Sequence, residues 1–143
     1  MSTFDRSSFS RAAVERGQDA NAPTRRSVLI VEDDTATARA IEVLLDRAGY
    51  DARVCHKGGD ALKQVRQDRP SALLIDVHLK DVSGLVLAQQ VRQELGPDVP
   101  IIMVSGDTSM ETLNSLPHVG ATYFLSKPMN ADSLVRHVRE WLA

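Results

Sequence analysis

Three short runs of entirely apolar residues constrain the fold of this chain most. They occupy residues 28–31, 72–75 and 101–104. Strands that are apolar at every position are typical of a parallel sheet that is buried on both faces. Further strands are expected at residues 51–55 and 123–126, and longer segments with helical spacing of apolar residues follow each strand. The pattern predicts a doubly wound α/β domain with a five-stranded parallel sheet.

The predicted helices begin after polar or Gly residues and end near Gly or Pro. They are expected over residues 36–48, after Gly59, from Ser83 to Leu95, over residues 109–116 and after Pro128. The helix over residues 109–116 is the weakest, because Ser, Thr and Asn lower its helix propensity. In the first helix the residues expected to face the core are Ala36, Ala40, Ile41, Leu44, Leu45 and Ala48.

The first 26 residues differ in composition from the rest of the chain. They are rich in Ser, Gly, Asn and Arg, and they hold five Arg against three acidic residues. Such a segment buries too little apolar surface to order itself, so we expect a flexible tail over residues 1–26. A short helix over residues 10–16, or a docking segment, is the alternative. One domain is expected over residues 27–143.

The overall composition disfavours several classes of protein. Aromatic residues make up 4% of the chain and the net charge is -2, so base-stacking RNA-binding designs are disfavoured and no direct nucleic acid partner is expected. The single cysteine, Cys55, cannot form an internal disulfide and is expected to be a core residue. No apolar run reaches the roughly 18 residues that span a bilayer. We expect a cytoplasmic protein with no membrane partner.

Polar residues stand directly after four of the five predicted strands. They are Glu32, Asp33, Asp34, Asp76, Ser105 and Lys127. Ligands bind at the carboxyl ends of parallel strands, so these side chains are expected to converge. Converging carboxylates repel one another unless a cation lies among them, and all-oxygen ligands indicate Mg2+. A Lys and a hydroxyl add donors for phosphoryl oxygens, and a carboxylate can act as the nucleophile. The set predicts a phosphoryl-transfer site.

Four motifs and one glycine carry a family resemblance. They are VLIVEDD over residues 28–34, LLIDVHL over residues 73–79, Gly84, MVSG over residues 103–106 and FLSKP over residues 124–128. Together they closely resemble the receiver domain of two-component response regulators, in particular the stand-alone, chemotaxis-regulator-like kind. The resemblance covers residues 27–143. It implies a flavodoxin-like sheet with strand order 2-1-3-4-5.

The resemblance also implies a phosphoacceptor and a set of metal ligands. Asp76 would accept the phosphoryl group, and Asp33 would bind Mg2+ directly. Glu32 would act on the metal largely through water. The main-chain carbonyl of His78 would be a further metal ligand, because imidazole itself suits softer ions.

The remaining implied roles concern the phosphoryl oxygens and the switch. Ser105 and Lys127 would hold phosphoryl oxygens, and Phe124 would move with Ser105 on activation, although a plain core role for this aromatic side chain is equally open. The face made by residues 109–116, strand 123–126 and the last helix would bind a downstream protein. The donor would be a histidine kinase or a phosphotransfer protein.

Three positions depart from the usual pattern of the family. Lys80 stands where Pro is common, so we expect a more mobile loop after Asp76. Ser105 replaces the commoner Thr, and Phe124 replaces Tyr, which removes a hydroxyl. Asp34 is expected to cap the following helix instead of joining the site.

The resemblance predicts a single-domain response regulator, a phosphoacceptor that assists its own modification and is not otherwise an enzyme. No attached output domain is expected, so output would be by protein contact. One alternative is a small Mg2+-dependent phosphohydrolase of the haloacid dehalogenase type, although that family places its nucleophilic Asp at the position of Glu32. The other alternative is a degenerate receiver that binds partners without phosphorylation.

Overall fold

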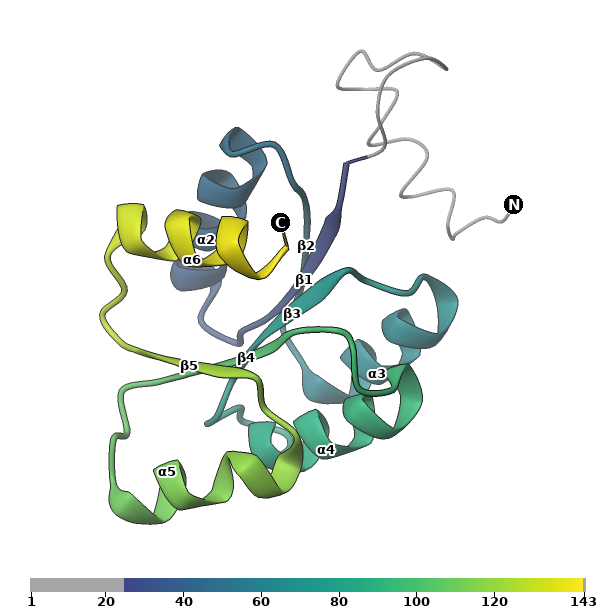
Figure 1. Ribbon diagram of the computed structural model, residues 1–143, viewed down its shortest axis with the longest axis vertical. Coiled ribbons are helices and arrows are strands. Elements are labelled where there is room, and N and C mark those ends of the chain that lie inside the picture. Colours follow the sequence, from purple (N-terminus) through teal and green to yellow (C-terminus); the bar gives the residue numbers. More distant parts are fainter. Residues whose placement is uncertain (1–24, 143) are drawn as a thin grey trace.

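Five parallel strands form the centre of the structure, a computed structural model that describes residues 25–142 (Figure 1). The strands are β1 (Ser27–Val31), β2 (Asp51–Cys55), β3 (Ala72–Asp76), β4 (Ile101–Ser105) and β5 (Tyr123–Ser126). Their order is β2-β1-β3-β4-β5, so the direction of winding reverses between β1 and β3. The register pairs Val31 with Ile75 and Asp76 with Val104, which brings the carboxyl ends of β1, β3 and β4 to one edge.

Helices cover both faces of the sheet (Figure 1). On one face lie α2 (Thr35–Arg47) and α6 (Ala131–Trp141). On the other lie α3 (Gly58–Gln67), α4 (Gly84–Leu95) and α5 (Met110–Ser115), followed by the short 3-10 turn η1 (Pro117–Val119). This arrangement, together with the strand order, confirms the predicted doubly wound, flavodoxin-like fold.

Alternate residues of the central strands point into two separate cores. Leu29 and Leu73 pack toward α3 and α4, whereas Ile30 and Leu74 pack toward α2 and α6. Every residue of β1, β3 and β4 is buried. The absence of polar alternation in these runs therefore follows from having helices on both sides of the sheet.

Two arginines attach the start of β1 to the ends of two helices. The Arg25 guanidinium donates to the carbonyls of Asp46, Gly49 and Tyr50 at 2.7, 2.9 and 2.6 Å, at the C-terminal end of α2. Arg26 donates to the carbonyl of Leu142, just after α6. The rest of the predicted tail over residues 1–26 lies outside the described residues.

Two details of the helices differ from the prediction. Ala36 and Ala40 are exposed, and α2 buries Ala38 together with Ile41 and Leu45. Burying a large aliphatic side chain contributes more than burying a methyl group, so the larger residues set which face of α2 turns inward. The predicted helix over residues 109–116 is confirmed as α5 with Ser109 and Leu116 as its caps, but the 3-10 turn η1 that follows it, beginning at Pro117, was not predicted.

Across residues 25–142, no helix combines the length and apolar character that crossing a bilayer requires.

Candidate functional site

Three carboxylates meet where β1 and β3 end. Glu32 and Asp33 follow β1, and Asp76 is the last residue of β3. Each contributes a carboxylate oxygen to a group in which all three oxygens lie within 4.8 Å of one another. Glu32 and Asp76 are only 3% and 7% exposed, whereas Asp33 is half-buried. The convergence expected from the strand ends is thus present.

Lys127, after β5, reaches into this carboxylate cluster. Its Nζ lies 2.8 Å from Glu32 Oε1 and 3.2 Å from Asp76 Oδ2. The second oxygen of Glu32, Oε2, accepts a hydrogen bond from the Asp34 amide at 3.1 Å. The ammonium therefore contacts two of the three carboxylates, and a cluster of three carboxylates and one ammonium keeps an excess of negative charge.

Burial and charge shift the ionisation of this group. Burial raises the pKa of Glu32 above its usual 4.5 and the charge of Asp76 adds to this, although hydrogen bonds from Lys127 and from the Asp34 amide oppose it. Burial lowers the pKa of Lys127, but its hydrogen bond to Glu32 and the charge of Asp76 outweigh that effect, so the net pKa is raised. Closely spaced oxygens with excess negative charge are a donor set suited to a hard divalent cation.

The backbone around Asp76 is tightly packed. The His78 amide donates to Asp76 Oδ1 at 3.0 Å, and the Gly84 amide donates to the Val77 carbonyl at 2.8 Å. A β-carbon on Gly84 would lie 1.9 Å from the carbonyl oxygen of Asp76. Only glycine therefore fits at the start of α4 in this arrangement.

The loop after Asp76, residues 77–83, is attached to its surroundings at two acidic side chains. Asp33 Oδ2 accepts a hydrogen bond from the Lys80 amide at 2.8 Å, a bond that proline at this position could not make. The Asp81 carboxylate accepts from the amides of Gly58 and Gly59, both at 3.1 Å, and so caps α3 from a distant part of the chain. These backbone hydrogen bonds lower the pKa of Asp81.

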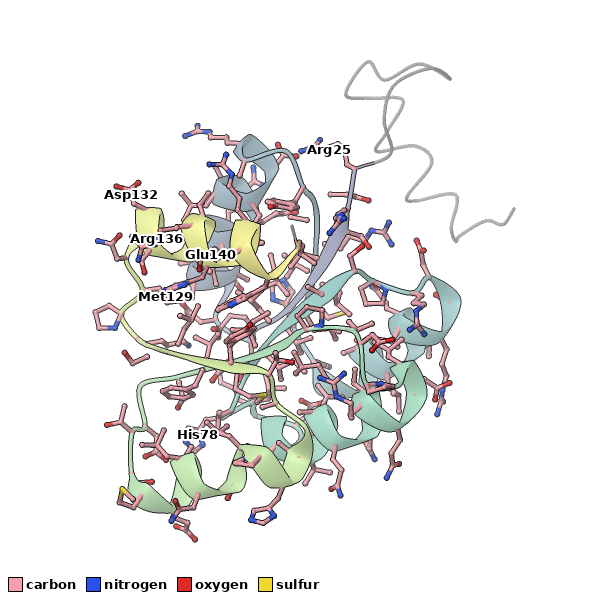
Figure 2. The ribbon with its side chains drawn as sticks, in the orientation of Figure 1. Arg25, His78, Met129, Asp132, Arg136 and Glu140 are labelled. Atoms are coloured by element: carbon pink, nitrogen blue, oxygen red, sulfur yellow. The ribbon has the colours of Figure 1, made fainter. Side chains whose placement is uncertain are left out.

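Ser105 lies at the end of β4, and its buried hydroxyl accepts a hydrogen bond from the Asp107 amide at 2.9 Å. Asp107 also accepts from the Ser109 amide at 2.9 Å and from the Thr112 hydroxyl at 2.8 Å. The His78 ring lies 3.1 Å from Asp107 Oδ2 (His78 is labelled in Figure 2). Hydrogen bonds, first from the Ser109 amide and then from Thr112, lower the pKa of Asp107.

This network, which joins the loop after Asp76 to the start of α5, was not predicted. The sequence shows no periodicity that pairs residue 78 with residue 107, because their contact depends on how two loops fold over the sheet edge. The same holds for the cap that Asp81 provides. In both cases the only sequence signal is an acidic residue in a loop, and such residues are common on surfaces.

The other singled-out residues lie as follows. Phe124, on β5, is half-buried and packs against the core that α3 and α4 cover. Asp34 caps α2, as predicted, by accepting from the Thr37 amide at 3.0 Å. Cys55 is a buried core residue, as predicted, and burial raises the pKa of its thiol to about 11. Met110 is 69% exposed at the start of α5.

A family model and two curated relatives match largely the same part of this chain. The family model described as "Response regulator receiver domain" matches residues 28–139. The nitrogen assimilation regulatory protein NtrX of Azorhizobium caulinodans is 34% identical over 110 residues, which is 76% of this chain and 24% of that protein. The response regulator MprA of Mycobacterium ulcerans is 31% identical over 115 residues, 80% of this chain and 49% of that protein.

A solved structure shows the same arrangement. The receiver domain protein (CheY-like) from Methanospirillum hungatei superposes with a TM-score of 0.79 at 28% identity, covering 83% of this chain and 94% of that one. The chain spans between about a quarter and a half of the length of the two curated relatives above.

Proposed function

Since this chain belongs to the response regulator receiver domain family, we propose that it accepts a phosphoryl group on Asp76 and signals through phosphorylation-dependent protein binding. The donor is a phosphohistidine on a histidine kinase or phosphotransfer protein. The chain is a phosphoacceptor that assists its own modification and does not act on a separate substrate. Its cytoplasmic location remains a prediction from the single cysteine.

The contact between Lys127 and Asp76 carries this proposal. Asp76 is the one carboxylate of the cluster that lies at the end of the central strand β3, and its Oδ2 is 3.2 Å from the Lys127 ammonium. That ammonium is placed to bind a phosphoryl oxygen once the group is attached. Ser105, on the neighbouring strand, supplies a hydroxyl at the same edge.

In the proposed reaction, a carboxylate oxygen of Asp76 attacks the phosphorus of the donor. The new bond joins that oxygen to phosphorus, and the bond between phosphorus and the imidazole nitrogen of the donor breaks. The electron pair of the broken bond remains on that nitrogen. The other ring nitrogen keeps its proton, so the donor side chain leaves as neutral imidazole. The nucleophile is an unprotonated oxygen of Asp76, and the Lys127 ammonium lies 3.2 Å from Oδ2, where it can contact the transferred group.

The carboxylate cluster fits a magnesium ion, and Asp33 and Asp76 would hold it directly, with the His78 carbonyl as a further ligand and Glu32 acting through water. When bound, Mg2+ would neutralise charge on the phosphoryl oxygens. Asp33 would then keep the Lys80 amide bond with one oxygen and use the other as a ligand.

Stand-alone action is also part of the proposal. The relatives above do not support this part, since both are longer than this chain. The downstream protein would bind the face formed by α5, β5 and α6, where Met110 and Tyr123 are exposed. No direct contact with nucleic acid is proposed.

The test is phosphorylation by acetyl phosphate with Mg2+, followed by intact mass spectrometry. The unmodified sequence should gain the mass of one phosphoryl group, and Asp76→Asn should gain none. Asp81→Asn, which changes an exposed carboxylate in the same loop, is the matched control and should still be modified. A phosphohydrolase would instead release phosphate continuously, and a degenerate receiver would show no gain in any variant.

A further inference from the structure

An apolar groove lies between α2 and α6. Its volume is about 440 Å³, and its lining residues come from both helices and from the segment that leads into α6. Those that the argument uses are Ala40, Ile41, Leu44, Lys127, Met129 and Leu134. Leu44 and Met129 are only half-buried, so a bound apolar group would cover surface that is now exposed to water.

The chain before β1 leaves the fold at the C-terminal ends of α2 and α6, the two helices that line this groove nearer their N-terminal ends. Arg25 is fixed to the C-terminal carbonyls of α2 and Arg26 to the carbonyl that follows α6. In Figure 2, Arg25 lies beside α2 and Met129 lies at the start of α6. The two helices that line the groove are therefore the two that hold the end of the preceding segment.

The length of that segment matches the distance to the groove. By its 13 residues, α2 is about 20 Å long. Residues 9–14 are separated from Arg25 by 11 to 16 positions, and a coil of that length has an average end-to-end distance of roughly 18–22 Å. A tether whose average length is close to the required span gives a local concentration in the millimolar range, so even weak docking becomes populated.

The composition of residues 9–14 suits an apolar groove. The sequence is FSRAAV, which holds Phe9 and Val14 with two alanines between them. These four apolar residues lie at the separations from Arg25 that match the length of α2. The polar members, Ser10 and Arg11, can remain in water.

We propose that residues 9–14 bind the α2–α6 groove of the same chain. The groove is then covered by the chain itself, next to Lys127, and a protein that binds this face must first displace the segment. This inference does not depend on phosphorylation of Asp76.

A nitroxide attached to Ser7→Cys in the full chain tests the contact. The native Cys55 is buried with a raised thiol pKa, so labelling at neutral pH is confined to the new cysteine. The methyl signals of Leu44 and Leu134 should broaden more than those of Leu62, which lies on α3 across the sheet. Equal broadening of Leu44 and Leu62 would overturn the proposal.

Substitutions on both sides of the contact sharpen the test. Phe9→Ser removes the aromatic side chain, and Ala40→Glu places a charge in the groove, so each should abolish the difference in broadening. Ala36→Glu is the matched control, because Ala36 is also exposed on α2 but does not line the groove. Identical behaviour of the two glutamate variants would contradict docking in the groove.

A second copy of the chain is the competing occupant. An isotope-labelled chain without nitroxide is mixed with a nitroxide-labelled chain without isotopes. The broadening should be absent from this mixture, because the proposed contact is within one chain. Broadening as strong as in the doubly labelled chain would show binding between copies and overturn the proposal.

Discussion

Gly84 lies against the carbonyl oxygen of Asp76 so closely that an added β-carbon would be 1.9 Å from it. We expect Gly84→Ala to lower the free energy of unfolding by about 1–3 kcal/mol, since the backbone of β3 or α4 must shift to make room. Urea unfolding measures the change. Gly106→Ala is the control, because nothing lies within 4 Å of a β-carbon there. A loss as large in the control would contradict the steric explanation.

Asp33→Asn should weaken Mg2+ binding by at least about tenfold, or ~1.4 kcal/mol, because it removes a charge from the carboxylate cluster. Isothermal calorimetry gives the affinity. Asp34→Asn is the matched control: this neighbouring residue caps α2, lies outside the cluster, and Asn caps a helix as well as Asp does. Equal losses in the two variants would show that general surface charge, and not a specific ligand, determines the affinity.

Glu32→Gln should stabilise the protein at pH 7 in the absence of divalent metal. Burial raises the pKa of Glu32 above 4.5, so the folded state binds this proton more tightly than the unfolded chain does. The free energy of unfolding of the unmutated protein therefore falls as the pH rises from 4.5 through the raised pKa of Glu32 in the folded state.

The advantage of the glutamine variant should accordingly shrink when the pH is lowered below that interval. Urea unfolding at pH 7 and at pH 4 measures the difference, with Glu111→Gln, an exposed residue of α5, as the control. If the difference in free energy of unfolding between Glu32→Gln and the unmutated protein grew from pH 7 to pH 4, the prediction would be wrong.

Phosphorylation should loosen the start of α5. The Ser105 hydroxyl now accepts from the Asp107 amide, and a phosphoryl group on Asp76 would accept its O–H and draw the hydroxyl away from that amide. Because Asp107 also bonds Ser109 and Thr112, the change should reach α5 and then β5, where Phe124 lies. Hydrogen exchange with and without beryllofluoride, a mimic of the phosphoryl group, should show faster exchange there.

Two comparisons decide this last prediction. Exchange in α3 should be unchanged, and Ser105→Ala should lose the response in α5 while Ser105→Thr keeps it. The proposed path from Ser105 through Asp107 to α5 would be falsified if the changes in exchange were confined to residues 77–83.

How far the sequence predicts this structure depends on how local each signal is. The buried runs that end at Val31 and Asp76 identify their strands and the shared sheet edge, because complete burial leaves no polar alternation. The prediction of the inward face of α2 was wrong at Ala36 and Ala40, since burying a methyl group contributes too little to determine how a helix is oriented. The contact between His78 and Asp107 could not be predicted, because it depends on how two loops pack over the sheet edge.

The cap that Asp81 provides has a consequence for exchanging parts between related proteins. Helix α3 begins without a side-chain cap of its own, and its first two amides are bound by a residue more than twenty positions later. Moreover, a β-carbon on Gly58 would lie 2.3 Å from Val82 Cγ2. In a chimera, a loop transplanted without the matching first turn of α3 would bring a clash and leave the helix frayed. We therefore expect residues 57–59 and 77–83 to be exchanged successfully only together.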